Sequence, residues 1–332
     1  MVTASVAKNP AELSAAPELA ADASRLGVAP ETQTNADEYI YLIGRPTLKQ
    51  FLRYVKNHAV NPPGQGTLTE EWQSANEVVR NLEKEEAGLA DNPAIQPVPP
   101  DNELLLEFLK NPLVKNSFNA VPTEVAFIDL NQVVVYQPHI DLTFVQQLKT
   151  TLGRTPMEEE VFRACLPHDQ PQPPVKWARV HQNSYVFLSP SNDLRFLGAM
   201  PMHPDHITGY PPPGNLAGVV GLAVGFGTNF LNAIYAENRL ILNNGSHRAY
   251  ALRDLGVTRV PCIVQHVSSR EELSILACTA VTDAPNFFLK EPRPMMLKDY
   301  FDPRLRKLMP VHRRLRQIIV KFELDEGFIP AF

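Results

Sequence analysis

The sequence predicts an α+β fold, because strand-like runs and helix-like stripes both occur along the chain. Residues 124–130 and 257–267 are rich in β-branched side chains, which is typical of strands. Residues 229–242 predict a β-hairpin, since two strand-like runs flank a short polar turn. In residues 142–152, apolar side chains recur at i, i+4 and i+8, which is helical spacing.

The remaining elements follow from the same signals of periodicity, capping and turn residues. Asp141 is placed to cap the helix at 142–152, and Gly153 is placed to end it. We expect order to begin near Tyr39, where the apolar run 39–43 precedes Gly44. The other expected elements are, in chain order, helices near 48–55, 69–89 and 102–110, strands 133–136 and 184–188, helices 247–255 and 269–280, and strand 318–322.

The composition limits the class of protein. The chain has 332 residues, 44% hydrophobic and 20% charged, which suits a globular protein with one large domain or two smaller ones. The net charge of -5 argues against a wholly basic nucleic-acid coat but allows a local basic patch. The three cysteines form no C-x-x-C pair, so neither a disulfide framework nor a cysteine-based zinc site is expected.

The sequence shows no signal peptide and no membrane span, so we expect a cytoplasmic protein with no membrane partner. The longest apolar stretch, 216–230, is rich in glycine and too short to cross a bilayer. We expect four parts along the chain. They are a disordered tail at 1–36, a small helical N-terminal module at 37–95, a main domain at 96–280 that carries an insertion at 154–226, and a basic C-terminal extension at 281–332.

The segment from Asn243 to Arg248 lies between a predicted strand and a predicted helix, and it has the features of an anion site. Gly245 permits positive φ and close backbone approach, and Ser246 is placed to cap the helix. The first N–H groups of a helix have no internal partner, and the macrodipole favours negative charge there. His247 and Arg248 add donors that suit phosphate oxygens. The alternative is an ordinary capped helix whose basic side chains face solvent or an acidic neighbour.

Two sequence boxes resemble the ParB/sulfiredoxin superfamily. The first is the hairpin, the Gly-Ser-His-Arg turn at 245–248, an alanine-bearing helix, Gly256, and then Val260-Pro261 in the next strand. The second is Val135-Tyr-Gln-Pro-His139, which precedes a helix and is similar to the Tyr-Gln-Pro-Arg box of ParB proteins. The two boxes together cover about 121–153 and 228–268.

This resemblance implies a mixed-sheet core that binds a nucleotide at the turn. Family members hydrolyse CTP, phosphorylate free serine with ADP, or use ATP to reduce an over-oxidised cysteine, and others are nucleases. A phosphotransferase or NTPase that uses ATP, ADP or CTP with Mg²⁺ is therefore the expected class of enzyme. By position, the phosphate-binding residues would be Asn244, Gly245, Ser246, His247 and Arg248, with Gln137 and His139 across the same cleft.

The chain also departs from its presumed relatives. Sulfiredoxins carry a reactive cysteine where this chain has Ser246, so thiol chemistry of that kind is not expected. Partition proteins carry Glu-Arg where this chain has Ser246-His247, which argues against their CTP switch.

A phosphoryl-transfer site would need a base or a magnesium ligand, and His139 and Asp141 are the candidates. The competing interpretation of Asp141 is a simple helix cap. His203 and His206 flank a Pro-Asp pair and could bind a metal, but proline breaks any helical face and no third ligand is evident. A solvated loop is the favoured interpretation of that segment, and the sequence identifies no metal site.

The C-terminal part of the chain is basic, since residues 290–321 hold ten Lys and Arg side chains against three acids. A basic helix here could bind DNA or RNA phosphates, or it could pack on the acidic remainder of the protein or on a partner. The candidate nucleic-acid contacts are Arg304, Arg306, Lys307, Arg313, Arg314 and Arg316.

Three functions from different classes remain open from the sequence. The first is a nucleotide-binding phosphotransferase or NTPase. The second is a nucleic-acid-binding protein or nuclease that uses the same turn together with the basic stretch. The third is a non-catalytic interaction module, because one fold can host many functions. The sequence does not identify the substrate or the oligomeric state.

Overall fold

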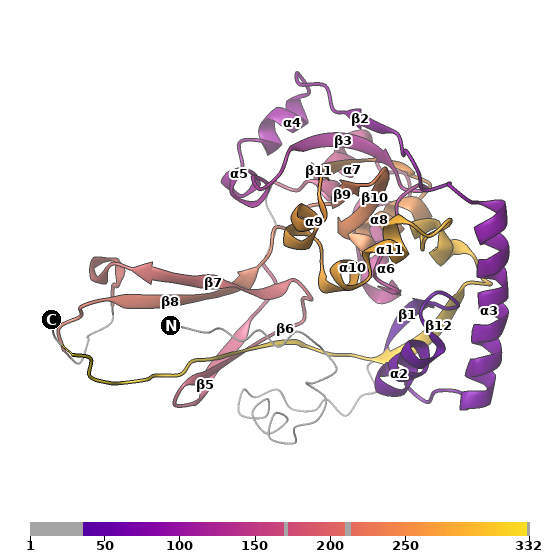
Figure 1. The fold of residues 1–332 in the computed structure, drawn as a ribbon. Helices are drawn as coiled ribbons and strands as arrows, with labels where there is room; N and C mark the ends of the chain where they lie inside the picture. The colour runs from indigo at the N-terminus through magenta and orange to yellow at the C-terminus, as the bar shows by residue number, and fades with distance from the viewer. Residues whose placement is uncertain (1–35, 169–171, 210–213, 331–332) are drawn as a thin grey trace. The chain divides into compact units, whose positions relative to one another are not determined.

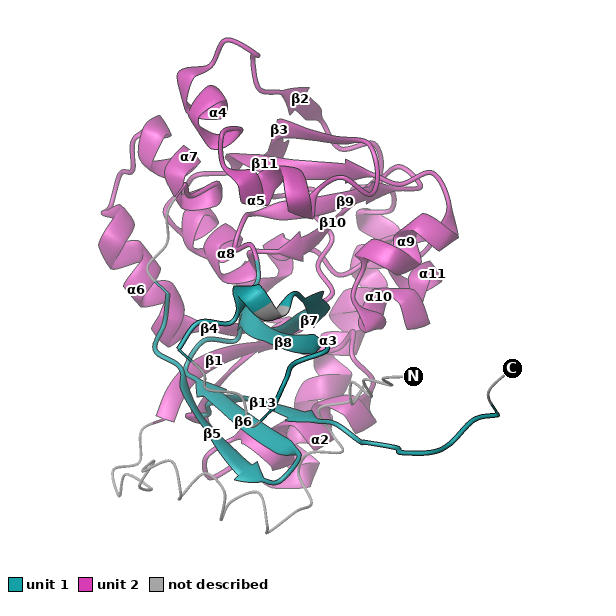
Figure 2. Ribbon diagram, turned by 90° about the vertical axis from the view of Figure 1, so that its left-hand side faces the viewer, with its two compact units in different colours: residues 1–34, 171–227, 314–332 teal, residues 35–170, 228–313 magenta. Residues whose placement is uncertain are grey.

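The computed structural model describes residues 36–168, 172–209 and 214–330, and it divides the chain into two compact units (Figure 2). The main unit contains residues 35–170 and 228–313. The second unit contains residues 171–227 and 314–332, together with residues 1–34. The disordered tail expected at 1–36 falls outside the described residues, apart from its last one.

The main unit is built on a five-stranded mixed sheet with the strand order β10-β9-β11-β3-β2 (Figure 1). Strand β11 pairs parallel to β9 on one side and antiparallel to β3 on the other. Helices accompany this sheet in the same unit, so the α+β class is confirmed. The strands are β2 (Ile95–Pro97), β3 (Thr123–Asp129), β9 (Asn232–Ala236), β10 (Arg239–Asn244) and β11 (Arg259–His266).

The predicted hairpin is present as β9 and β10. Its turn residues Glu237 and Asn238 both have positive φ, 47° and 66°, as a two-residue type I′ turn requires. The strand expected at 133–136 is absent: Val134 forms only single bridges, one to Ile241 and one to Met296. The backbone hydrogen bonds of residues 133–135 are divided between β10 and the segment 295–297. The apolar side chains of this stretch therefore reflect its burial and not a continuous strand pairing.

The helices of the main unit begin and end largely where capping residues predict. Asp141 caps α6 (Leu142–Leu152) by accepting from the Phe144 N–H at 3.0 Å, and Gly153 ends it with φ 73°. The helix expected at 269–280 is instead two helices, because Ala277 is extended between them. The other helices are α4 (Glu103–Phe108), α5 (Pro112–Ser117), α7 (Glu158–Cys165), α8 (Ser246–Asp254), α9 (Arg270–Leu276), α10 (Thr279–Asp283) and α11 (Pro285–Leu289).

The expected N-terminal module is not separate from the rest of the main unit. Strand β1 (Ala36–Leu42) pairs with β12 (Arg306–His312) and with β4 (His139–Asp141). Helices α2 (Leu48–His58) and α3 (Gln65–Glu85) contribute to one core cluster with β12. Residues 306–312 of the basic stretch therefore form a strand of this unit, and the expected basic helix is wrong. Alternating burial along β12 explains this, since Met309 and Val311 point inward and their neighbours outward.

The expected insertion at 154–226 differs from the structure at its start, because α7 belongs to the main unit. Residues 171–227 form the second unit together with the end of the chain. Its three-stranded sheet has the order β13-β6-β5, from β5 (Lys176–His181), β6 (Ser184–Ser189) and β13 (Arg316–Lys321). Strands β7 (Leu194–Met202) and β8 (Val219–Phe226) form a two-stranded ribbon. Over the described ranges, no helix is both long and apolar enough to cross a membrane.

Candidate phosphate site

The predicted anion turn joins β10 to α8 in the main unit. Gly245 adopts the left-handed conformation, with φ 95° and ψ 23°, and the helix begins at Ser246. A Cβ at this position would lie 2.5 Å from the Cδ1 atom of Leu231. Both the positive φ and the close packing therefore require glycine here, as the sequence predicted.

The cap of α8 differs from the prediction, because Gly245 and not Ser246 occupies the cap position. Positive φ at the glycine starts the helix one residue earlier, so Ser246 becomes its first residue and is buried. The first helical bond runs from the Ala249 N–H to the Gly245 carbonyl at 2.8 Å, and no side chain caps this end. The N–H groups of residues 246–248 therefore lie ahead of the helical ladder, where an anion is favoured.

Arg248 has a different position from the one that a phosphate ligand would need. Its side chain is buried, and it donates to the Cys165 carbonyl at 2.9 Å and to the Asn229 carbonyl at 2.9 Å. It also donates to Oδ1 of Asn229. The guanidinium thus connects the start of α8 to the end of α7 and to the segment before β9. We therefore assign Arg248 a positioning role and not a direct contact with phosphate.

His247 lies beside the open end of α8. Its ring packs edge-on against Phe144, with the ring centroids 5.5 Å apart and an interplanar angle of 76°. The Nε2 atom is buried and has no hydrogen-bond partner among the described residues. Burial lowers the pKa of His247 to about 4, so the imidazole is neutral at pH 7 and can contribute a hydrogen bond but no charge.

The burial of His247 predicts a specific loss of stability in acid. Its pKa is about 4 in the folded protein against 6.5 for the ordinary side chain. Below pH 6.5 the unfolded chain takes up a proton that the folded chain does not, so stability is complete above this pH and falls between 6.5 and 4. We expect the free energy of unfolding of the wild type to fall by about 2–3 kcal/mol between pH 7 and pH 4.5 from this group alone.

His247→Phe should remove this contribution, because phenylalanine keeps the ring and does not titrate. Urea unfolding of both proteins at the two pH values measures the difference. An equal loss of stability in the wild type and in His247→Phe would show that another group is responsible.

The second sequence box contacts the strand end just before the turn through Tyr136. The Tyr136 hydroxyl donates to the carbonyl of Asn243 at 3.1 Å. The amide of Gln137, however, donates to the backbone carbonyl of His139 at 2.7 Å, so it is directed toward its own segment. The amide of Asn244 donates to the Thr228 carbonyl at 3.3 Å. These two predicted ligands therefore support the backbone around the turn.

The two candidate catalytic residues, His139 and Asp141, make contacts that stabilise the fold. The ring of His139 stacks with Tyr39, with centroids 5.8 Å apart, and also packs against Tyr54. Asp141 caps α6, and burial raises the pKa of its carboxyl. Within the described ranges, no three His, Cys, Asp or Glu side chains are placed to bind a metal together.

The basic side chains predicted to contact nucleic acid also have partners within the chain. Arg304 pairs with Asp302, Lys307 with Glu71 and Arg313 with Asp37. Arg306 and Arg316 donate to backbone carbonyls, and Arg314 follows β12. The six side chains are divided between the two units, and the three ion pairs reduce the charge available to nucleic acid.

The solvated-loop interpretation of His203 and His206 fits, since His203 is exposed and pairs with Asp205 at 3.0 Å.

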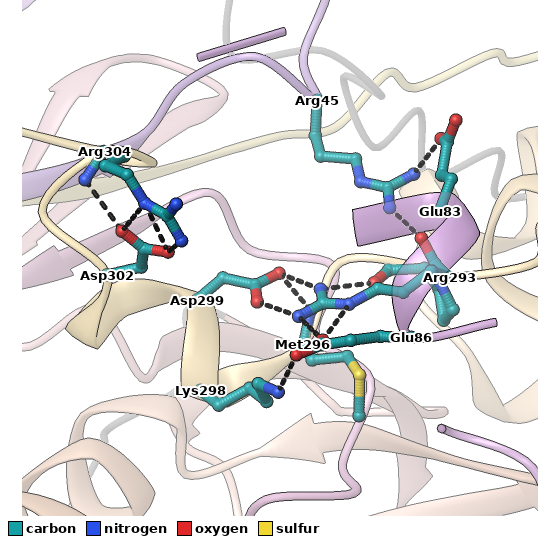
Figure 3. A network of polar contacts seen from close by, with 10 residues as sticks. Arg45, Glu83, Glu86, Arg293, Met296, Lys298, Asp299, Asp302 and Arg304 are labelled. Carbon is teal, nitrogen blue, oxygen red and sulfur yellow. Dashed lines mark hydrogen bonds and ion pairs between the residues drawn. The ribbon is translucent and has the colours of Figure 1, made fainter. Parts of the chain in front are cut away.

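One buried network of charges was not predicted from the sequence. Arg293 is 1% exposed and binds Asp299 through both terminal nitrogens, and it also binds Glu86 (Figure 3). Lys298 binds the other oxygen of Glu86, and Arg45 donates to the Arg293 carbonyl. This network connects α3 to the segment before β12. An arginine flanked by two prolines and followed by apolar residues was the only local signal for it.

Comparison of the chain with known protein families, with curated proteins and with solved structures finds no match.

Proposed function

We propose that this chain binds a phosphate-bearing nucleotide at the turn between β10 and α8, on a mixed-sheet core of the ParB/sulfiredoxin-like type. The observation that carries the proposal is the start of α8. Three backbone N–H groups precede the helical ladder there, next to a neutral His247 whose buried Nε2 atom has no partner in the described chain. A phosphate oxygen would satisfy these donors, and the helix dipole would favour its charge.

The order of elements around the turn supports the same proposal. A hairpin leads into the turn, α8 follows it, and β11 returns beside β9 in the mixed sheet. Tyr136 connects the second box to the residue just before the turn. The order of hairpin, turn, helix and strand is the one that the resemblance implied, and ATP, ADP and CTP are the proposed ligands.

The proposed class of reaction is phosphoryl transfer or nucleotide hydrolysis. Mg²⁺ would supply charge neutralisation on the phosphates, while the chain's own residues bind and orient them. We place the protein in the cytoplasm, a proposal that its free cysteines Cys165, Cys262 and Cys278 support.

A thermal unfolding screen tests the proposal with ATP, ADP, CTP and inorganic phosphate, each with and without Mg²⁺. A ligand that binds only the folded protein adds about 2.7 kcal/mol at one hundred times its Kd, so a true ligand should raise the midpoint clearly. His247→Phe should weaken binding about tenfold, because it removes one hydrogen bond to the ligand. The unliganded variant should be as stable as the wild type or more stable, since an unsatisfied polar group disappears.

His312→Phe is the matched control, because it replaces an exposed histidine of β12. It should leave the ligand-induced shift unchanged. If none of the four ligands raises the midpoint of the wild type, the proposal is wrong.

A further inference from the structure

One face of the three-stranded sheet in the second unit carries a cluster of aromatic rings. Trp177 of β5 lies opposite Phe187 of β6, which lies opposite Ile318 of β13. Two residues along the strands, Tyr185 lies between Arg179 and Val320. Side chains alternate between the faces of a strand, so these two rows share one face.

This aromatic face is the open face of the sheet. Trp177 is 61% exposed, and its ring stacks on Phe187 with centroids 6.0 Å apart and an interplanar angle of 19°. Tyr185 stacks with Phe322 at the end of β13, with centroids 6.5 Å apart. On the opposite face, Val186 and Leu188 are buried. The exposed Trp177 ring and the half-buried rings of Tyr185, Phe187 and Phe322 offer flat surfaces on which further rings can stack.

The same sheet is strongly basic. Strands β5, β6 and β13 contain four basic residues, Lys176, Arg179, Arg316 and Lys321, and no Asp or Glu, in a chain with a net charge of -5. All four are exposed. Arg179 donates to the Gln182 carbonyl and Arg316 to the Leu194 carbonyl, and neutral carbonyls leave the positive charges in place. The sheet therefore differs from the stretch 304–313, where ion pairs compensate several charges.

We propose that this aromatic face binds single-stranded nucleic acid, with bases stacked on Trp177 and the rings beside it and with the backbone phosphates near Arg179 and Arg316. Alternation places these two arginines on the aromatic face, and it places Lys176 and Lys321 on the opposite face of the same sheet. Exposed rings on a sheet face suit unstacked bases, since every base has a π-face. A duplex keeps its bases stacked inside and offers no ring to Trp177. An acidic peptide would match the charge but would leave the stacking surface without a partner. The site is separate from the proposed nucleotide turn and does not depend on it.

Fluorescence anisotropy and tryptophan quenching test the proposal on the full chain. The probes are labelled oligo(dT), oligo(U) and a duplex of the same length at low salt. Trp72 and Trp177 are the two tryptophans of the chain, so a Trp72→Phe background isolates the signal of Trp177. We expect both single strands to bind and to quench Trp177, and the duplex to bind more weakly without quenching. The comparison of oligo(dT) with oligo(U) shows whether the DNA or the RNA probe binds more tightly.

Two variants separate stacking from charge. Trp177→Ala should weaken binding by about one to two orders of magnitude, because it removes a stacked base. Arg316→Ala should lower the slope of log K against log salt by about 0.7, the value for one phosphate contact on a single strand. Phe328→Ala and Arg80→Ala are controls that remove an exposed ring and an exposed arginine elsewhere, and they should have no effect. His247→Phe should also bind the oligonucleotides normally, which separates this site from the nucleotide turn.

Several results would overturn the proposal. One is the absence of any anisotropy change at micromolar protein and low salt. The others are duplex binding as tight as single-strand binding, and unchanged affinity in Trp177→Ala. Quenching of Trp177 by a peptide of residues 322–330, with no response to oligonucleotides, would instead assign the face to the chain's own acidic tail.

Discussion

Replacing Arg293 with alanine is expected to lower the free energy of unfolding by about 3–5 kcal/mol, the cost of breaking a buried ion pair on one side. Arg293 is 1% exposed and contacts both oxygens of Asp299, at 2.5 Å each. The Asp299 side chain is only 4% exposed, so its carboxylate would remain buried with its main partner removed. Glu86 would lose two hydrogen bonds as well. Urea unfolding followed by circular dichroism measures the change.

Arg163→Ala is the matched control, because it also removes an arginine that binds two carboxylates. Arg163 pairs with Glu107 and Glu159 on the surface, where its side chain is 47% exposed. Exposed ion pairs contribute about 0–1 kcal/mol, so this variant should lose little stability. Equal losses in Arg293→Ala and Arg163→Ala would contradict the structural role assigned to the buried network.

Replacing Arg248 with methionine is expected to lower the free energy of unfolding by about 3 kcal/mol and to abolish ligand binding at the turn. The carbonyls of Cys165 and Asn229 would each lose a hydrogen bond from Arg248, although the Cys165 carbonyl would keep the Leu231 N–H at 2.8 Å. Hydrogen bonds to a charged group contribute about 1.5–3 kcal/mol each. Without these bonds, the start of α8 is no longer attached to α7. Chemical unfolding and the ligand-induced thermal shift together measure both effects.

Arg248→Lys distinguishes the positioning role from direct phosphate contact. Lysine keeps the positive charge but lacks the planar fork that reaches two carbonyls at once. We expect Arg248→Lys to lose most of the stability that Arg248→Met loses. Full stability in Arg248→Lys, with only weaker ligand binding, would show that the guanidinium serves the phosphate directly.

Short-range features of the fold could be predicted because a few neighbouring residues encode them. Asp141 and Gly153 specify both ends of α6 through a cap and a positive φ. The hairpin turn at Glu237-Asn238 and the turn at Gly245 are also local features. In each, residues with positive φ reverse or redirect the chain within a few positions. The turn between β10 and α8 was therefore placed correctly from the sequence.

Features that depend on distant segments could not be predicted. The partners of Arg248 lie 83 and 19 residues away, so the direction of its side chain has no local signal. The basic residues after 304 resembled an exposed helix. In the structure, β12 instead pairs with β1, which lies far from it along the sequence. In the same way, β13 pairs with β6, and no periodicity in either segment indicates that they belong to one sheet.

Calorimetric titration of the wild type and of His247→Phe with ADP, ATP and CTP, in the presence of Mg²⁺, tests the nucleotide site most directly. The start of α8 and the Nε2 atom of His247 predict saturable binding with one ligand per chain, about tenfold weaker in His247→Phe and unchanged in His312→Phe. Absence of binding heat for all three nucleotides, or equal affinity in the wild type and in His247→Phe, would contradict this account of the turn.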